Sequence, residues 1–383
     1  MKPLKIELHL LQNFPPSCLN RDDTNTPKTC EFGGVTRARV SSQCWKRAVR
    51  EHFAENAPER LGIRSKRLKS ELIAALIAAG KGTGETLDVP VTKFVTSFYA
   101  NMDKKRPDET NVLVFYSQAE FSAMLDTLSE DEMLTELSKE IPVLKKNDIE
   151  KRLKGASLST DVALFARMLA DAPSLHLDAA CQVAHAISTH SVNLELDFFT
   201  AVDDLKDTAK NDDAGAGMLG TVGFDSACYY RYSLVDEVQL RKNFHGSVED
   251  TDASLKAFLT AFCESVPGAK KNSFAPGNPP FFGFFVVRCE GTPSSLVNAF
   301  ARPVNTRNGN LLNESALALS RYAGKLNACY ELYENTETVK TFLFHMLEND
   351  ADLTGLPTTE KLSMRKAIAG VLEAVKACRE AGE

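Results

Sequence analysis

Polar and apolar positions alternate at the beginning of the chain. The side chains divide into two sets, Ile6, Leu8 and Leu10 against Lys5, Glu7 and His9. Every second side chain of a strand lies on the same face of a sheet, so this alternation is typical of a half-buried strand. We therefore expect residues 3–12 to form a strand with one buried face and one solvated face.

The spacing of apolar residues changes from two to four over residues 41–56. Trp45, Val49 and Phe53 lie four residues apart, which places them on one buried stripe of a helix. Serine is a preferred N-cap, because its hydroxyl accepts a hydrogen bond from a backbone N–H of the first turn. The pattern therefore predicts a helix that begins at Ser42.

The rest of the chain alternates between the same two patterns. Residues 60–155 are mostly helical in their periodicity, with a capping box S-x-x-E at 117–120. Further strands are expected at 35–40, 160–169, 179–196, 227–236 and 279–291, and further helices at 251–266, 313–333 and 359–380. Without the helical segment and a glycine-rich excursion near 195–226, the order is close to βαββαβ. That order predicts an α+β fold on the ferredoxin-like plan, which RNA-recognition domains use.

Composition narrows the class of protein. The chain has 383 residues, of which 43% are hydrophobic and 25% charged, as in ordinary globular proteins with a sizeable core. No apolar run approaches the roughly 18 residues that a membrane helix needs, and charges interrupt the N-terminal apolar stretch. We therefore expect a cytoplasmic protein with no membrane contact. The nine cysteines include no C-x-x-C pair, which predicts reduced thiols and no zinc site.

Charge is distributed unevenly. The net charge of −6 disfavours a nucleic-acid-binding protein, yet residues 28–50 hold six basic residues against one acidic residue. Within that segment Gln43, Lys46 and Arg50 form a second stripe on the predicted helix, separate from the apolar one. Unpaired backbone N–H groups at a helix start attract anions, and Ser41 and Ser42 add hydroxyl donors. The segment therefore predicts a phosphate-binding site.

The stretch GAGMLG at 215–220 has the form G-x-G-x-x-G of a dinucleotide-binding turn. That turn follows a strand and opens a helix, whereas this stretch follows the acidic run KNDDA and precedes TVGFDS. Aspartates at this approach would repel a pyrophosphate. We interpret the stretch as a mobile turn with Met218 and Leu219 at its point.

Several motifs, in order along residues 6–271, closely resemble those of one family: SCLNRDD, FGG…R.RVSSQ..KRA.R, AHAI.TH, DFFTAVDDL, LGT..F.S, YYRY and VPGAK. The chain is similar through them to the CasC family, the backbone subunit of the type I-E CRISPR surveillance complex, Cascade. The resemblance implies an RNA-recognition-like palm (1–59, 156–194 and 227–310), a helical fingers insertion (60–155), a thumb (195–226) and C-terminal helices (311–383). It also implies partners: CRISPR RNA, target DNA through the guide, neighbouring copies of the chain and other Cascade subunits.

The resemblance further implies roles for individual residues. Positions that match contacts to the RNA backbone are Arg21, Lys28, Ser41, Ser42, Gln43, Lys46, Arg50, Lys270 and Lys271. Arg167 and Met168 match a site beside a displaced base, where Met168 would wedge between nucleotides. Met218, Leu219 and Gly220 would form the tip of a thumb that folds over the RNA towards the next copy. The thumb segment is longer and more acidic than the family pattern, and the aromatic RNA-stacking motif of recognition folds is absent.

Two functions follow from these residues. The first is a non-catalytic RNA-binding scaffold, which needs no cofactor and no metal. The alternative is a metal-dependent endoribonuclease of the type III backbone kind, with Asp22 and Asp23 as its carboxylates. An aspartate pair beside Arg21 is more typical of an ion-paired turn, and His185 and His190, five apart in an expected strand, would lie on opposite faces. We therefore expect the scaffold.

Overall fold

The structure, a computed structural model, describes residues 3–167, 175–201, 218–305, 310–347, 353–358 and 360–382. The chain divides into two compact units, one of residues 1–52, 183–234 and 259–383, the other of residues 53–182 and 235–258. Sheet and helices are mixed and the sheet pairings are antiparallel, so the predicted α+β class is confirmed. No helix within the described ranges is long and apolar enough to span a membrane.

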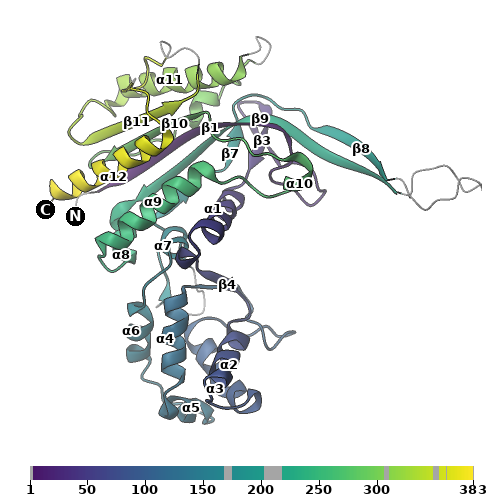
Figure 1. The fold of residues 1–383 in the computed structure, drawn as a ribbon, viewed down its shortest axis with the longest axis vertical. Coiled ribbons are helices and arrows are strands. Elements are labelled where there is room, and N and C mark those ends of the chain that lie inside the picture. Colours follow the sequence, from purple (N-terminus) through teal and green to yellow (C-terminus); the bar gives the residue numbers. More distant parts are fainter. Residues whose placement is uncertain are drawn as a thin grey trace, which may run out of the picture. The chain divides into compact units, whose positions relative to one another are not determined.

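The first unit is built around one large sheet (Figure 1). The described strands follow the order β11-β10-β1-β9-β7-β3-β2, and β6 and β8 also pair with β9. Their bounds are β1 Lys5–Ser17, β2 Thr29–Phe32, β3 Val35–Val40, β6 Cys181–Val183, β7 Ala186–Ser188, β8 Glu195–Ala201, β9 Met218–Asp236, β10 Phe282–Arg288 and β11 Val339–His345. Strand β11 was not predicted; it pairs with β10, with Phe342 opposite Phe285.

Helices cover both faces of this sheet. The helices assigned to the first unit or crossing its boundary are α1 Ser42–Asn56, α9 Val248–Glu264, α10 Lys271–Phe274, the short η4 Val297–Phe300, α11 Leu311–Tyr330 and α12 Met364–Glu380. Leu319 of α11 shares an apolar cluster with Phe284 of β10. On the other face, a Cβ at Gly370 of α12 would stand 2.4 Å from the ring of Phe342, so only glycine allows this approach.

Strand β1 is therefore buried on both faces, and the predicted solvated face is wrong. Glu7 and His9 are both 0% exposed. Glu7 accepts hydrogen bonds from Arg288 Nε and Ser294 N, each at 2.6 Å, and Nδ1 of His9 lies 2.8 Å from the hydroxyl of Tyr230. Burial raises the pKa of Glu7 against the opposing effect of Arg288, and burial lowers the pKa of His9 to about 3.

The second unit is mainly helical. Its elements are η1 Pro58–Arg60, β4 Ile63–Ser65, α2 Leu68–Ala78, α3 Gly84–Phe98, β5 Val114–Tyr116, α4 Gln118–Leu128, α5 Asp131–Ser138, α6 Lys146–Gly155, α7 Thr160–Phe165 and α8 Glu237–Asn243. The predicted capping box is confirmed, since Ser117 and Glu120 each bond the other's backbone N–H. The strand predicted at 160–169 is wrong: Thr160–Phe165 is helical, and the Asp161 carboxylate accepts the N–H groups of Gly62 and Val162.

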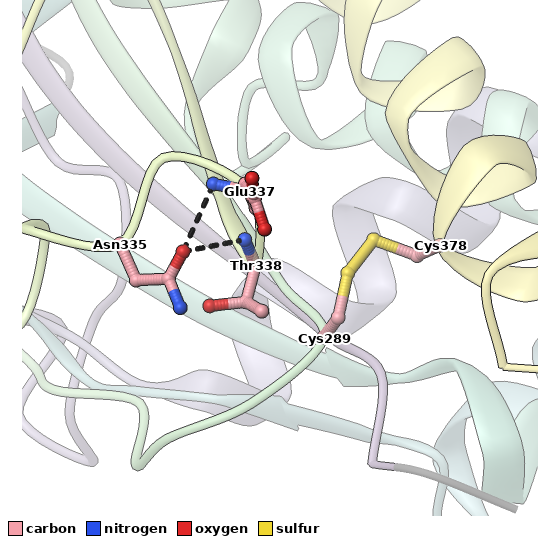
Figure 2. The surroundings of a disulfide bond; sticks show 5 residues. All are labelled: Cys289, Asn335, Glu337, Thr338 and Cys378. Carbon is pink, nitrogen blue, oxygen red and sulfur yellow. Dashed lines mark hydrogen bonds between the residues drawn. A yellow bond between two sulfur atoms is a disulfide. The ribbon is translucent and has the colours of Figure 1, made fainter.

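A disulfide joins Cys289, just after β10, to Cys378 in α12, with Cα atoms 5.9 Å apart (Figure 2). The prediction that the cysteines are all thiols is therefore wrong at these two positions, and the other seven are free. The two residues are 89 apart in sequence and meet because α12 folds back onto β10 and β11.

Candidate nucleic-acid interface

The loop between β1 and β2 is fastened to the start of α1. The side-chain oxygen of Asn20 accepts a hydrogen bond from Ser41 N at 2.9 Å, and its backbone oxygen accepts one from Lys28 N at 2.8 Å. The thiol of Cys44 points to the carbonyl of Leu19 at 3.6 Å. These bonds fix the position of Arg21 relative to the helix. Asn20 is a positioning residue that the sequence reasoning missed.

The same loop is held internally by Asp22. Its carboxylate accepts hydrogen bonds from the Thr24 hydroxyl at 2.8 Å, from Thr26 N at 3.1 Å, from the Thr26 hydroxyl at 3.0 Å and from Thr24 N at 2.9 Å. These bonds lower the pKa of Asp22. Arg21 does not pair with Asp22 but donates to the side chain of Asn25 at 2.8 Å. Asp22 therefore closes an Asx turn, a structural role that occupies both of its oxygens.

Helix α1 begins at Ser42, as predicted. Ser41 caps it, since its hydroxyl accepts a hydrogen bond from Cys44 N at 3.3 Å. The predicted buried stripe of Trp45, Val49 and Phe53 is confirmed, each being 1% exposed. The first turn leaves backbone N–H groups without intrahelical partners, which makes this end of α1 suitable for an anion.

Beneath this helix start lies a buried cation. The guanidinium carbon of Arg231 in β9 lies 3.5 Å from the centre of the Trp45 ring and 4.5 Å from the centre of the Phe262 ring. Burial lowers the pKa of Arg231 to about 9. Its Nη1 donates to Gln12 at 2.5 Å and its Nη2 to the carbonyl of Phe262 at 2.6 Å. This stacking packs the first turns of α1 against β9.

A cavity of about 540 Å³ opens at the junction of these elements. Three segments line it: the loop 19–21, the first turns of α1, and the loop 268–270 before α10. Among the predicted residues, Arg21, Ser41, Gln43 and Lys270 lie on its wall. Lys270 Nζ donates to the carbonyl of Asn25 at 3.3 Å, which joins the third segment to the first.

The cavity also contains residues that the sequence reasoning did not single out. Arg47 lies on its wall with Glu51, and the two form an ion pair at 2.8 Å. Because both side chains are exposed, their ion pair contributes at most about 1 kcal/mol to stability. Arg47 can therefore exchange Glu51 for another anion at little cost in free energy. The sequence signal was present, because an acid four residues after an arginine on a helix predicts this pair.

The other predicted contacts lie outside the lining of this cavity. Ser42, Lys46 and Arg50 lie along α1, and Lys271 begins α10. Lys28 lies near a second polar group that was missed, where Arg39 Nη1 is 3.0 Å from His185 Nδ1. Burial, Arg39 and Lys28, in that order, lower the pKa of His185. His190 is buried instead, with Nε2 accepting a hydrogen bond from Cys228 N at 3.3 Å.

Arg167 belongs to the second unit and is 6% exposed. Its guanidinium pairs with buried Glu120 at 2.6 Å and donates to the carbonyls of Phe115 and Leu175. These bonds give it a structural role within that unit, and its contact with RNA stays a prediction. Met168 lies outside the described residues.

The thumb segment is a two-stranded ribbon of β8 and β9 that projects from the sheet (Figure 1). The backbones of Met218 and Leu219 pair with β8, and Gly220 lies opposite Phe199, so the turn predicted at these three residues is wrong. A Cβ at Gly220 would meet the Phe199 ring at 2.4 Å, which explains glycine here without a turn. The acidic part of the segment, 202–217, lies outside the described residues.

The described residues contain no group of three or more His, Cys, Asp or Glu side chains arranged to hold a metal ion. Residues 6–368 match the family described as CT1975-like protein. A comparison with curated protein sequences finds no significant match.

Two solved structures are similar over nearly the whole chain. One is a chain of a "CRISPR RNA-guided surveillance complex, pre-nicking", with 29% identity and a TM-score of 0.83, covering 97% of this chain and 100% of that chain. Another, of a "CRISPR RNA-guided surveillance complex", has 25% identity and a TM-score of 0.73, covering 97% and 99%. The resemblance predicted from the motifs is confirmed at the level of the family. The chain belongs to the family of CT1975-like proteins.

Proposed function

We propose that this chain is a non-catalytic subunit of a CRISPR surveillance complex of type I-E, and that it binds the ribose-phosphate backbone of the guide RNA. The observation that carries the proposal is the cavity where Arg21, Gln43 and Lys270 meet the capped start of α1. Backbone N–H groups, an amide and two cations suit phosphate oxygens and do not distinguish bases. Sequence would then be read by pairing between the guide and target DNA.

The test is the salt dependence of RNA binding. Replacing Arg21 and Lys270 by alanine removes two charges from the cavity wall. The slope of log affinity against log salt should decrease by about 0.7 per lost phosphate contact, or about 1.4 in all, equally for guides of different sequence. Fluorescence anisotropy with labelled single-stranded RNAs measures it.

The matched control removes two exposed cations elsewhere, Arg365 and Lys366 in the first turn of α12. This double alanine variant should keep the slope of the wild type. An unchanged slope for Arg21→Ala with Lys270→Ala, or an equal change in both variants, would contradict the proposed binding site.

The proposal that the chain does not cleave RNA is tested separately. The carboxylate of Asp22 accepts protein donors on both oxygens, which supports a turn rather than a metal ligand. RNA incubated with the purified chain and Mg²⁺ or Mn²⁺ should remain intact. Cleavage that disappears in both Asp22→Asn and Asp23→Asn would establish the endoribonuclease alternative instead.

We also propose that copies of the chain assemble side by side on the RNA through the ribbon of β8 and β9. Leu196 and Phe198 lie on the same face of β8 and are 64% and 62% exposed, an apolar surface that a neighbouring copy could cover. Replacing both by serine should preserve binding to a short RNA that holds one copy and reduce cooperative binding to a longer RNA. Unchanged cooperativity would exclude the ribbon from the contact between copies.

A further inference from the structure

A second and larger cavity lies in the first unit, away from the residues of the RNA site. Its volume is about 740 Å³. The wall consists of the end of β10 with the segment after it (288–295), the last turns of α11, and the segment 331–339 that ends in the first residue of β11. Nothing in the proposed RNA contact uses these residues.

The wall of this cavity is held in place by bonds within the protein. The side-chain oxygen of Asn335 accepts the N–H groups of Glu337 and Thr338 at 3.0 and 3.4 Å (Figure 2). The N–H of Cys289 donates to the carbonyl of Thr338 at 2.8 Å, and its sulfur is bonded to Cys378. The segments on two sides of the cavity are therefore joined to each other and to α12, so the cavity is largely preformed.

The electrostatics of the cavity favour a cation. Glu290 and Glu331 are exposed carboxylates on its wall. Helix α11 ends here, and its last carbonyls add a partial negative charge. Arg288 is the one cation among the described lining residues, and Glu7 at 2.6 Å already neutralises it.

One wall is apolar and partly aromatic. Tyr322, Leu326 and Tyr330 lie four residues apart on α11 and therefore share a face of the helix. Tyr330 is 70% exposed, an unusual state for a large aromatic side chain. The methylene stem of a lysine or arginine packs well on such a face, and its charged end is attracted to aromatic rings.

The helix end itself has a strained residue. Glu331 adopts φ +52° at the C-cap, a left-handed conformation for which glycine is normally selected. Glutamate at this position therefore costs stability relative to glycine, and it provides one of the exposed carboxylates on the wall of the cavity.

We propose that this cavity binds a lysine or arginine side chain on a peptide segment of another protein. The volume is that of a site for a drug-sized ligand, which fits a basic side chain with its flanking residues. Glu290 and Glu331 pair with the charged end of the basic side chain, and its methylene stem packs on the apolar face of α11. The inference does not depend on the proposed RNA contact, because the two cavities share no residues.

The experiment titrates the full chain with the peptide Ala-Leu-Lys-Leu-Ala, with blocked ends, by isothermal titration calorimetry. The same peptide with Gln in place of Lys measures the contribution of the charge. Glu290→Gln with Glu331→Gln removes both carboxylates. Glu337→Gln is the matched control, because Glu337 is exposed in the same segment but does not line the cavity.

The expected result is saturable binding of the Lys peptide, weakened about tenfold by the double variant and by the Gln peptide, and unchanged in Glu337→Gln. Equal binding of the two peptides, equal loss in the control, or no saturable binding at millimolar concentration would overturn the proposal. Spermidine that binds the cavity more tightly than the peptide would also overturn it, since the ligand would then be a free polyamine. Unaltered fluorescence of Trp45 shows that the double variant is folded.

Discussion

Asp225 offers a quantitative test of the electrostatics near the candidate nucleic-acid interface. It lies in β9 and is 3% exposed. Burial raises its pKa to about 6, against the opposing effect of a hydrogen bond from the Tyr229 hydroxyl at 3.2 Å. Burial raises the pKa of the Cys18 thiol, Lys270 lowers it, Asp225 raises it and Arg21 lowers it, in that order of size. The carboxylate of Asp225 therefore belongs to the same charge environment as two residues of the candidate interface.

The sign and size of its effect follow from linkage. An acid whose pKa is higher in the folded state than in the unfolded state costs stability wherever it is ionised. The rise from 3.8 to about 6 corresponds to about 3 kcal/mol at pH 7 and about 1.5 kcal/mol at pH 5, and the cost vanishes below pH 3.8. Asp225→Asn removes the charge and keeps the shape. It should raise the free energy of unfolding by about 2 kcal/mol at pH 7, somewhat less than the full cost because the amide N–H groups also need partners.

The assay uses a reporter that the chain already contains. Trp45 is the single tryptophan of the sequence, is 1% exposed and packs in the same apolar cluster as Tyr229. Its fluorescence during urea denaturation follows the part of the first unit that contains Asp225. Measurements at pH 7, 6 and 5 compare the wild type, Asp225→Asn and the exposed control Asp23→Asn, which should change stability by less than about 0.5 kcal/mol.

The predicted gain must shrink as the pH falls. A variant that is less stable than the wild type at pH 7, or a gain that is the same at pH 7 and pH 5, would refute the assignment of a buried, ionised carboxylate at this position.

Three further predictions concern the stability of the fold and its disulfide. Gly33→Ala should lower the free energy of unfolding, measured by thermal denaturation, by more than about 3 kcal/mol, because the new Cβ would lie 1.7 Å from the carbonyl oxygen of Ala301. The control Gly34→Ala, also at positive φ but with open space around it, should lower it by only about 1–2 kcal/mol. In urea without reductant, dithiobis(nitrobenzoic acid) should titrate seven thiols, and nine after reduction; nine thiols in both cases would contradict the disulfide. Glu120→Gln leaves the buried charge of Arg167 unpaired and should lower the free energy of unfolding, followed by circular dichroism, by about 3–5 kcal/mol. The control Glu130→Gln, in an exposed pair with Arg152, should lower it by less than about 1 kcal/mol.

The parts of the fold that the sequence predicted correctly depend on short-range patterns. The start of α1 at Ser42 and its buried stripe follow from a cap and a four-residue spacing within one segment. The capping box at Ser117 follows in the same way. Where neighbouring residues determine the structure, the local pattern is sufficient.

The errors occur where a distant residue decides the outcome. The polar face of β1 is buried because Arg288, 281 residues away, pairs with Glu7 and because α11 covers that face. The disulfide joins residues 89 apart, and no spacing rule selects that pair among nine cysteines. Strand β11 is a short apolar run whose pairing partner, β10, becomes evident only in three dimensions.

The candidate site shows the same division. The helix start and its serines were evident from local sequence, whereas Lys270 entered through the family motifs and reaches the site through its bond to Asn25. Asn20 was missed because a lone asparagine in a polar loop resembles an ordinary turn residue. Its role is visible only once Ser41, 21 residues later, is seen to donate to it.

Strand β9 runs without interruption for 19 residues, from the ribbon into the middle of the sheet. Gly220 lies near its outer end, and Arg231, farther along, supports Trp45 under the first turns of α1. A displacement of the ribbon would therefore be transmitted along one continuous strand to the residues beneath α1, because no loop interrupts β9 between Gly220 and Arg231. Under the proposed function, contact between copies at the ribbon and RNA binding at α1 would therefore be mechanically coupled.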